Sequence, residues 1–385
     1  MSNNRILTTS MLGSIGAFNI AMLPWWAQPL TMDGFMRGVS LDESQSGSLI
    51  AIELFLVCIA SLIMSLKVSK LPLRSVSVFS AIVVMISNGL SMQYDGTALI
   101  ALRAVAGVFE GVLMACATAA LASSRDPDKA YGVQNIGNIL FCSAFLAVAP
   151  FLENQVGPRS VFLAFSLASL LLLPIIFGLP TKIDVAVANV KFENKASGAL
   201  VLLVMLVWGT TVAIPWFFLV DIGSRTALSI HQVGLIAGCS GLGGLIGGAL
   251  ATRLGRSVNR RLILAGGLVI LSATTFVLVY WVNSVAFIIS VFLFIACLYT
   301  LFPYLFGLAA DLDPKGGLPA AMGAVYVLTG STGAFLGGHA VHEFGLESMA
   351  WLVAVGAVIC YPLLLIVLRQ REKQLTPLNA ELATH

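Results

Sequence analysis

The sequence predicts an all-α polytopic membrane protein with twelve transmembrane helices in two pseudo-symmetric six-helix bundles. Of its 385 residues, 58% are hydrophobic and 10% are charged, and the mean hydropathy is +0.95. Because an average soluble domain has about 25% charged residues, an ordinary water-soluble globular protein is excluded. The apolar residues also form long runs without Asp, Glu, Lys or Arg, and a helix needs about 20 apolar residues to cross a membrane.

The helices follow from these runs in chain order. Eight charge-free runs each predict one crossing, and the longer run 262–310 predicts two, divided at Asn283-Ser284. Two more crossings contain single charges, which are Glu53 in one and Arg103 and Glu110 in the other. The runs are continuously apolar and do not alternate with period two, which favours helices over a β-barrel. The expected spans are 6–30, 44–66, 75–93, 97–123, 131–152, 159–179, 198–220, 229–252, 262–281, 284–309, 317–341 and 348–368.

The distribution of Lys and Arg predicts the orientation. Seventeen of them lie on the side that carries both chain ends, whereas Arg37, Arg159 and Arg225 lie on the other side. We therefore expect a multi-pass protein of the cytoplasmic (inner) membrane with both termini in the cytoplasm. The net charge of +3 is then a consequence of topology, and no nucleic-acid partner is expected. The first apolar segment is interpreted as a retained helix and not as a signal peptide.

A polar stretch and an internal repeat divide the chain into halves. We expect an N-terminal bundle over 1–180, a cytoplasmic linker over 181–197, a C-terminal bundle over 198–369 and a cytoplasmic tail over 370–385. Pro24-Trp25-Trp26 ends the first helix and Pro215-Trp216-Phe217 lies near the end of the seventh. At a constant offset of 187, Leu41, Gln45 and Gly47 match Leu228, Gln232 and Gly234. Repeated membrane halves are typical of transporters that rock around a central site.

The loop after the eighth helix carries a resemblance to a known family. It contains Gly248, Arg253, Gly255 and Arg256, and it resembles the cytoplasmic loop motif of the major facilitator superfamily, G-x-x-x-D-R/K-x-G-R-R/K. Thr252 takes the place of the acid and Ser257 that of the last basic residue. The resemblance implies the twelve-helix fold and transport by alternating access, with a conformational role for these loop residues.

Three ionisable residues lie where the membrane interior is expected. Such groups cost several kcal/mol by insertion scales unless they are paired or face water. We interpret Glu110 and Glu53 as proton-coupling groups, and Arg103 as a group that attracts a substrate anion or keeps an acid charged. The alternative is an ion pair between Arg103 and an acid that only fixes helix packing.

The spacing from Arg103 to Gly111, R-x-x-x-G-x-x-E-G, is similar to the fourth-helix motif of anion:cation symporters and spinster-like lipid transporters. In those families the glutamate is protonated during transport, which implies that role for Glu110. Arg103 also fits the fourth-helix motif of proton-coupled drug antiporters, although Ala106 stands at their Gln position. The symporters often add an ionisable group in the first helix, where this chain has only Asn19 and Gln28.

Polar and aromatic residues in other helices are the remaining candidates for substrate binding. The eighth helix is also rich in glycine, and we expect its glycine face around Gly244 to approach and leave its neighbours during transport. The six cysteines are interpreted as packing residues, so no disulfide, metal site or cofactor is expected. The substrate-contact candidates, besides Arg103, are Asn19, Gln28, Asn135, Asn138, Trp208, Trp216, Tyr299 and Tyr326.

The sequence predicts a secondary active transporter, and an enzyme is disfavoured. The first hypothesis is proton-coupled symport of a small organic anion, and the alternative is efflux of amphipathic drugs or metabolites by proton antiport. An anion site should leave Arg103 free to meet the substrate, whereas an exporter of amphipathic compounds should pair it and show a larger aromatic cavity. The expected partners are the small-molecule substrate, protons and the lipid bilayer, and the chain is expected to be a monomer.

Overall fold

The computed structural model describes residues 9–124, 127–183, 195–255, 258–313 and 317–382. Every regular element within these ranges is a helix, and ten helices are long and apolar enough to cross a membrane. The shorter apolar helix α8 (Ser160–Ile176) and α1 (Thr9–Trp26) complete the twelve predicted crossings. The predicted all-α fold of two six-helix bundles is confirmed.

The first half holds the crossings α1, α3, α4, α5, α6 and α8. The short helix α2 (Gln28–Gly38) continues α1 after a break at Ala27, and α7 (Glu153–Val156) with two 3₁₀ turns, η1 (Val68–Lys70) and η2 (Ala149–Leu152), completes the connections. The remaining bounds are α3 (Glu43–Ser65), α4 (Leu73–Ser91), α5 (Gly96–Ala122) and α6 (Pro127–Val148).

The second half repeats this order. Its short helix α10 (Leu219–Arg225) follows α9 (Lys195–Phe217) as α2 follows α1. The last helix, α15 (Ser348–Leu382), continues well past the predicted end at 368, so the expected tail is helical as far as Leu382. The other bounds are α11 (Ile230–Leu254), α12 (Arg260–Tyr280), α13 (Ser284–Leu312) and α14 (Gly317–Phe344).

The sequence repeat has a local structural cause. Asp42 and Gln45 form a capping box at the start of α3, and Ser229 and Gln232 form the same box at the start of α11. In each box a side-chain oxygen accepts a backbone N–H that the helix leaves unpaired. Pro24 and Pro215 lie just before the ends of α1 and α9. Proline removes a helical hydrogen bond, so both helices end there and a short helix follows.

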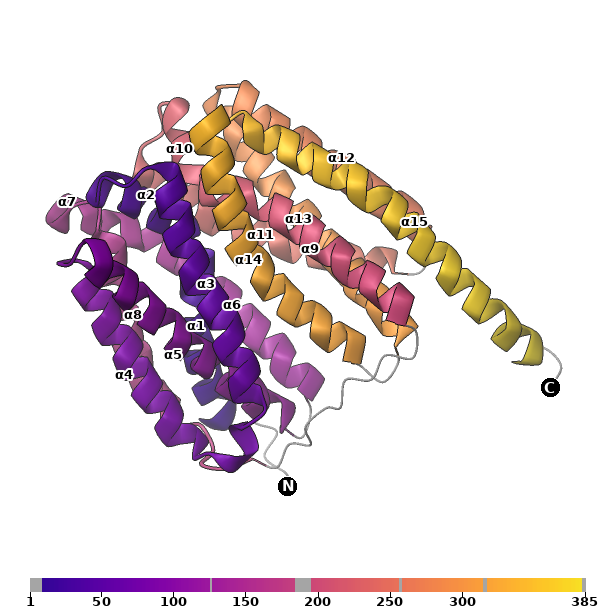
Figure 1. Ribbon diagram of the computed structural model, residues 1–385, viewed down its shortest axis with the longest axis horizontal. Helices are drawn as coiled ribbons and strands as arrows, with labels where there is room; N and C mark the ends of the chain where they lie inside the picture. The colour runs from indigo at the N-terminus through magenta and orange to yellow at the C-terminus, as the bar shows by residue number, and fades with distance from the viewer. Residues whose placement is uncertain (1–8, 125–126, 184–194, 256–257, 314–316, 383–385) are drawn as a thin grey trace.

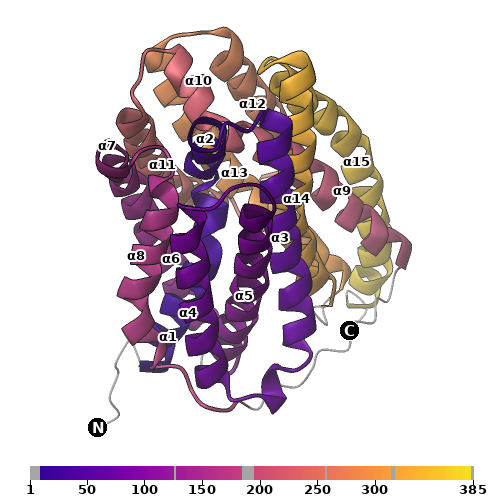
Figure 2. The same ribbon diagram turned by 60° about the vertical axis from the view of Figure 1, so that its left-hand side comes forward.

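The two halves lie side by side and meet along two helix pairs, α3 with α14 and α6 with α11 (Figure 1). Figure 2 places α2 and α10 at one end of the molecule. We call this end the α2–α10 side, and the opposite end, where α8 ends and α9 begins, the linker side. The packing on the α2–α10 side uses glycine. A Cβ on Gly47 would lie 2.3 Å from the carbonyl oxygen of Ala334, and one on Gly234 would lie 2.6 Å from that of Leu146.

Gly244 does not lie at the contact between the halves. Its nearest neighbour is the ring of Tyr299 on α13, in the same half, and a Cβ added at Gly244 would lie 3.0 Å from that ring. Gly238 and Gly241 instead face Ser143 of α6. The glycine face that meets the other half is therefore displaced around α11 from the one expected.

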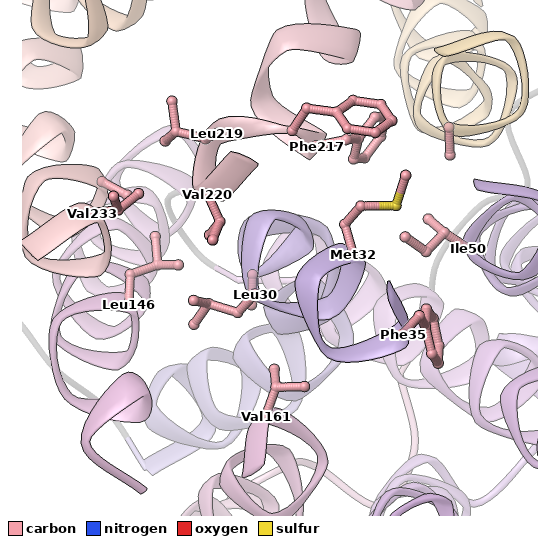
Figure 3. Close-up of a cluster of buried hydrophobic side chains, with 14 of the residues drawn as sticks. Leu30, Met32, Phe35, Ile50, Leu146, Val161, Phe217, Leu219, Val220 and Val233 are labelled. Carbon is pink, nitrogen blue, oxygen red and sulfur yellow. The ribbon is translucent and has the colours of Figure 1, made fainter. Parts of the chain in front are cut away.

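A buried apolar cluster closes the α2–α10 side (Figure 3). Leu30, Met32 and Phe35 of α2 form its centre, and side chains from both halves surround them. Opening this side requires separating these surfaces and exposing them. Its other labelled members are Ile50, Leu146, Val161, Phe217, Leu219, Val220 and Val233.

We predict that Gly47→Val opens the α2–α10 side, because the added side chain has no room against the backbone of α14. Overpacking costs roughly 1–3 kcal/mol, or about 5- to 150-fold in the equilibrium between closed and open. Spin labels on the exposed Gln93 and Val282, with the exposed Cys239 changed to Ser, would report longer distances. The matched control is Gly266→Val, whose Cβ would meet nothing within 4 Å. Identical distance distributions in both variants would contradict the prediction.

Candidate functional site

A central cavity lies between the halves, where the ends of α1 and α9 meet α13 and α14. The space that it offers to a water-sized molecule is about 60 Å³, within about 590 Å³ of non-atom space that includes open solvent. Aromatic and aliphatic side chains make almost the whole lining, and no lining residue carries a charged side chain. The lining residues are Trp25, Trp26, Gly209, Val212, Ala213, Trp216, Phe217, Phe294, Ile295, Leu298, Tyr299 and Tyr326.

Trp26 is the point at which both halves meet in the cavity wall. Its ring stacks on Tyr299, with centroids 6.3 Å apart and planes at 19°. Its edge contact with Trp216 has centroids 6.4 Å apart, and the Trp216 indole N–H donates to the Trp26 carbonyl oxygen at 3.1 Å. Trp25 lies beside Tyr326 at 5.2 Å. The cavity is therefore formed by rings from both halves that contact one another.

A pair of buried amides orients Trp26. The Trp26 Nε1–H donates to Asn138 Oδ1 at 3.0 Å, and Asn138 Nδ2 donates to Asn19 Oδ1 at 2.8 Å. Asn138 and Asn19 thus contact the cavity wall from behind. Asn135 is exposed, and Gln28 is buried with its Oε1 unpartnered among the described residues.

A buried charge cluster lies within the first half, centred on Arg103 of α5. Arg103 and Glu53 are both almost fully buried, and their side chains form an ion pair of 3.1 Å. Arg103 Nη2 also donates to Asn88 Oδ1 at 2.8 Å and to Ser91 Oγ at 3.0 Å. The guanidinium carbon lies 4.9 Å from the ring centroid of Phe162. Arg103 is paired in this structure and is absent from the cavity lining.

The glycines of the R-x-x-x-G-x-x-E-G motif bring the cluster together. A Cβ on Gly107 would lie 2.3 Å from the carbonyl oxygen of Glu53, and one on Gly111 would lie 2.4 Å from that of Val57. No larger residue fits at either position without moving α3. The close crossing of α3 and α5 therefore places Glu53 beside Arg103. Glu110 follows Arg103 about two turns later on α5.

Glu110 differs from Glu53 in its hydrogen bonding. Its side chain is fully buried, and both carboxylate oxygens are unpartnered among the described residues. A buried carboxylate without a donor is costly in its charged form. The cluster holds one guanidinium and two carboxyl groups, so it is electrically neutral when one of the two carboxyl groups carries a proton.

The other candidates from the sequence lie apart from these two places. Trp208 is buried in the core of the second half, edge-on to Phe302 at 5.9 Å, and does not line the central cavity. Gly255 caps α11 with φ 46°, and Tyr304 Oη donates to its carbonyl oxygen at 3.0 Å. Gly248 and Arg253 lie in the last turns of α11, Arg253 with an exposed side chain, and Arg256 lies outside the described residues.

Sequence reasoning did not select Asn88, Ser91 and Phe162, which surround Arg103, or Trp25 and Trp26 as cavity residues. The sequence did contain a signal for the two tryptophans. Pro24-Trp25 recurs as Pro215-Trp216, and Trp216 contacts Trp26. Asn88 and Ser91 lie three residues apart on α4 in a run of small side chains. Their spacing is that of one helical face, but nothing in the sequence relates that face to Arg103.

The comparisons with known proteins agree with the architecture. The sequence model of the Major Facilitator Superfamily matches residues 6–197 and, a second time, residues 196–383. No curated protein matches the sequence. The structure is similar to that of the nucleoside transporter NupG, with a TM-score of 0.73, 12% identity and 94% of this chain and 99% of that chain covered.

Two further solved structures show the same fold. A D-xylose-proton symporter has a TM-score of 0.69 and 14% identity, with 92% of this chain and 95% of that chain covered. A bacterial homologue of the human lysosomal transporter Spinster, in an inward-facing and unoccupied conformation, has a TM-score of 0.68 and 12% identity, with 95% and 96% covered.

We predict that Arg103 and Glu53 are strongly coupled in stability. Removing one partner of a buried ion pair costs about 3–5 kcal/mol because the other charge is left uncompensated. Arg103→Leu alone should therefore lower the melting temperature in detergent more than the double variant Arg103→Leu/Glu53→Leu does. The exposed pair Arg225–Glu347 is the control, since exposed pairs contribute only about 0–1 kcal/mol. Additive losses for Arg103 and Glu53 would show that the pair is not coupled.

Proposed function

The chain belongs to the Major Facilitator Superfamily and is a secondary transporter, and we propose that it moves an amphipathic, ring-containing organic solute in exchange for protons. The single observation that carries this proposal is the central cavity, whose lining is aromatic and aliphatic and includes residues of both halves. Arg103, the buried basic residue of α5, does not line this cavity and forms an ion pair with Glu53. The paired Arg103 and the aromatic lining are two of the features expected of an exporter of amphipathic compounds, and they support this proposal.

The chemistry of the cavity selects flat apolar groups. Aromatic pairs gain about 0.5–1.5 kcal/mol beyond the area that they bury, and Trp25, Trp26, Tyr299 and Tyr326 offer four rings. Polar selection would come from a few groups, chiefly the hydroxyl groups of the two tyrosines. A small anion would find no fixed positive charge among the lining residues.

The fourth-helix motif supports a second candidate, proton-coupled symport of an organic anion. The spacing of Arg103, Gly107, Glu110 and Gly111 is complete. For this mechanism Arg103 would have to leave Glu53 and reach the cavity in another state of the cycle. Protonation of Glu53 would weaken the ion pair and favour that movement.

Glu110 is the proposed proton-coupling residue in either mechanism. It is buried, its carboxylate oxygens lack a donor among the described residues, and Arg103, seven residues earlier on α5, forms its ion pair with Glu53. A proton on one carboxyl group neutralises the cluster, and its release requires contact with water. Access of water from one side and then the other would couple proton movement to alternation of the two halves.

We also propose that the linker side faces the cytoplasm of the cell, in the inner membrane, because Lys and Arg are concentrated there. The α2–α10 side then faces outward, and its packed contacts make this structure one that is closed to the outside.

We predict that Glu110→Gln abolishes proton-driven transport but preserves solute exchange, because Gln imitates the protonated acid. The measurement is transport of a ring compound in proteoliposomes, with and without an imposed pH gradient, compared with counterflow of the same compound. Asp95→Asn, at an exposed carboxyl group on the α2–α10 side, is the control and should keep both activities. Accumulation against a gradient in Glu110→Gln would remove the residue from proton coupling.

A second prediction tests the chemical class of the transported solute. Tyr299→Leu removes one ring from the cavity and should weaken binding of neutral ring compounds by about 2- to 13-fold, the equivalent of one aromatic contact. Tyr361→Leu, at an exposed position on α15, should leave their Kd unchanged. The panel also includes carboxylated forms of the same rings. Preference for the carboxylates, together with a higher Kd for them in Arg103→Lys, would favour the anion symporter instead.

A further inference from the structure

The short helices α2 and α10 form a direct contact between the two halves. They belong to different halves and lie together on the α2–α10 side (Figure 2). Each carries one aspartate, Asp33 on α2 and Asp221 on α10. When the halves separate on this side, this contact must break.

The two aspartates differ in their partners. Asp33 is held in a bidentate ion pair by Arg37, one turn later on the same helix. Arg37 is shared with Glu153, whose Oε1 lies 2.8 Å from Nη1. Among the described residues Asp221 has no ion-pair partner, and its Oδ2 is buried without a hydrogen bond.

The charged groups that face Asp221 are mostly acidic. Asp33 on α2 and Glu43 at the start of α3 repel its negative form, and Arg37 attracts it weakly. Glu43 is itself 3.2 Å from His342 of α14. On α11 the first polar side chain is His231, which stacks on Phe151 and lies 3.4 Å from Asn154 Oδ1. The charged residue at the end of α10 itself, Arg225, is paired with Glu347.

Burial has the largest effect on the pKa of the Asp221 carboxyl group. Burial together with the negative charges of Asp33 and Glu43 raises the pKa of this carboxyl group from 3.8 to about 7, against the lowering effects of a backbone hydrogen bond and of Arg37. The geometric reason is that Asp221 Oδ2 is buried without a hydrogen bond on a helix that packs against α2, although the residue as a whole is partly exposed and its carboxyl group accepts one backbone hydrogen bond.

We infer that Asp221 is a second proton-binding site, which takes up a proton when the α2–α10 side closes and releases it to the water on that side when the halves separate. The protonated acid is neutral and fits the packed contact, whereas the ionised acid needs water and favours the open state. This site is distinct from Glu110, which lies within one half, and it does not depend on which solute is carried.

The direction of the pH effect follows from the linkage between proton binding and closure. The open state has an ordinary Asp and the closed state has a raised pKa, so closing takes up a proton between about pH 4 and pH 7. Low pH therefore favours closure. The equilibrium between closed and open should change by about tenfold per pH unit in this window and level off above about pH 7.

The test is a distance measurement across the α2–α10 side. Spin labels are placed on Gln93 and Val282 in the Cys239→Ser protein, with Glu110→Gln added so that the proton site of the proposed function is silent. Distances are recorded from pH 5 to pH 8 in lipid nanodiscs without added solute. We expect the short-distance population to fall as the pH rises, and we expect Asp221→Asn to hold it high at every pH.

Two variants make the result decisive. Glu347→Gln removes an exposed acid of the same region and should keep the pH dependence. Asp221→Ser removes the carboxyl group with a smaller side chain and should lose it, as Asp221→Asn does. An unchanged pH dependence in both Asp221 variants, or distances that are independent of pH in the parent protein, would overturn the proposal while leaving the role of Glu110 untouched.

Discussion

The fold of the first half depends on satisfying one guanidinium in an apolar interior. Arg103 has no exposure to solvent, and an isolated charge there would cost several kcal/mol. Glu53, Asn88 and Ser91 bind its two terminal nitrogens from two neighbouring helices, whereas its Nε has no hydrogen-bond partner among the described residues. They reach the guanidinium because Gly107 lets α3 and α5 approach to backbone contact. The pairing of this charge and the close crossing at glycine therefore occur together, and the motif contains both the charged residues of α5 and the glycines of the crossing.

The aromatic cavity obeys a different constraint, which is that both halves must supply its wall and still separate. Trp26 meets this requirement. Within its own half it is held by Asn138, and across the interface it offers its carbonyl oxygen to Trp216 and its ring face to Tyr299. The contacts within the half involve buried amides, whereas those across the interface are one hydrogen bond and ring surfaces. Separation of the halves can thus leave the orientation of Trp26 intact.

The sequence predicted the crossings to within a few residues because charge-free runs and helix spans have the same physical cause. It also indicated that Glu53, Arg103 and Glu110 lie within membrane-spanning helices, because charged residues inside apolar runs stand out in the sequence. It did not predict α2 and α10 as separate helices, because they follow proline breaks and mix apolar with charged residues. Partners such as Asn88 for Arg103, or Asn138 for Trp26, depend on helix rotation and register across distant segments. Hydropathy contains no information on either, and for the same reason it did not show that Trp208 lies in the core of the second half or that Gly244 faces Tyr299 of its own half.

The positions of the two carboxyl groups that lack partners imply a division of roles. Glu110 is buried on α5 of the same half as Glu53 and Arg103, so rocking of the halves as rigid bodies leaves these two neighbours in place, and its protonation responds to water and to them. Asp221 lies on α10, whose contact with α2 exists only while the halves touch on the α2–α10 side, and its Oδ2 is buried there. Its exposure to water increases in the movement itself. A group of the first kind can store a proton through the conformational change, and a group of the second kind can make the change depend on the pH of the side that opens.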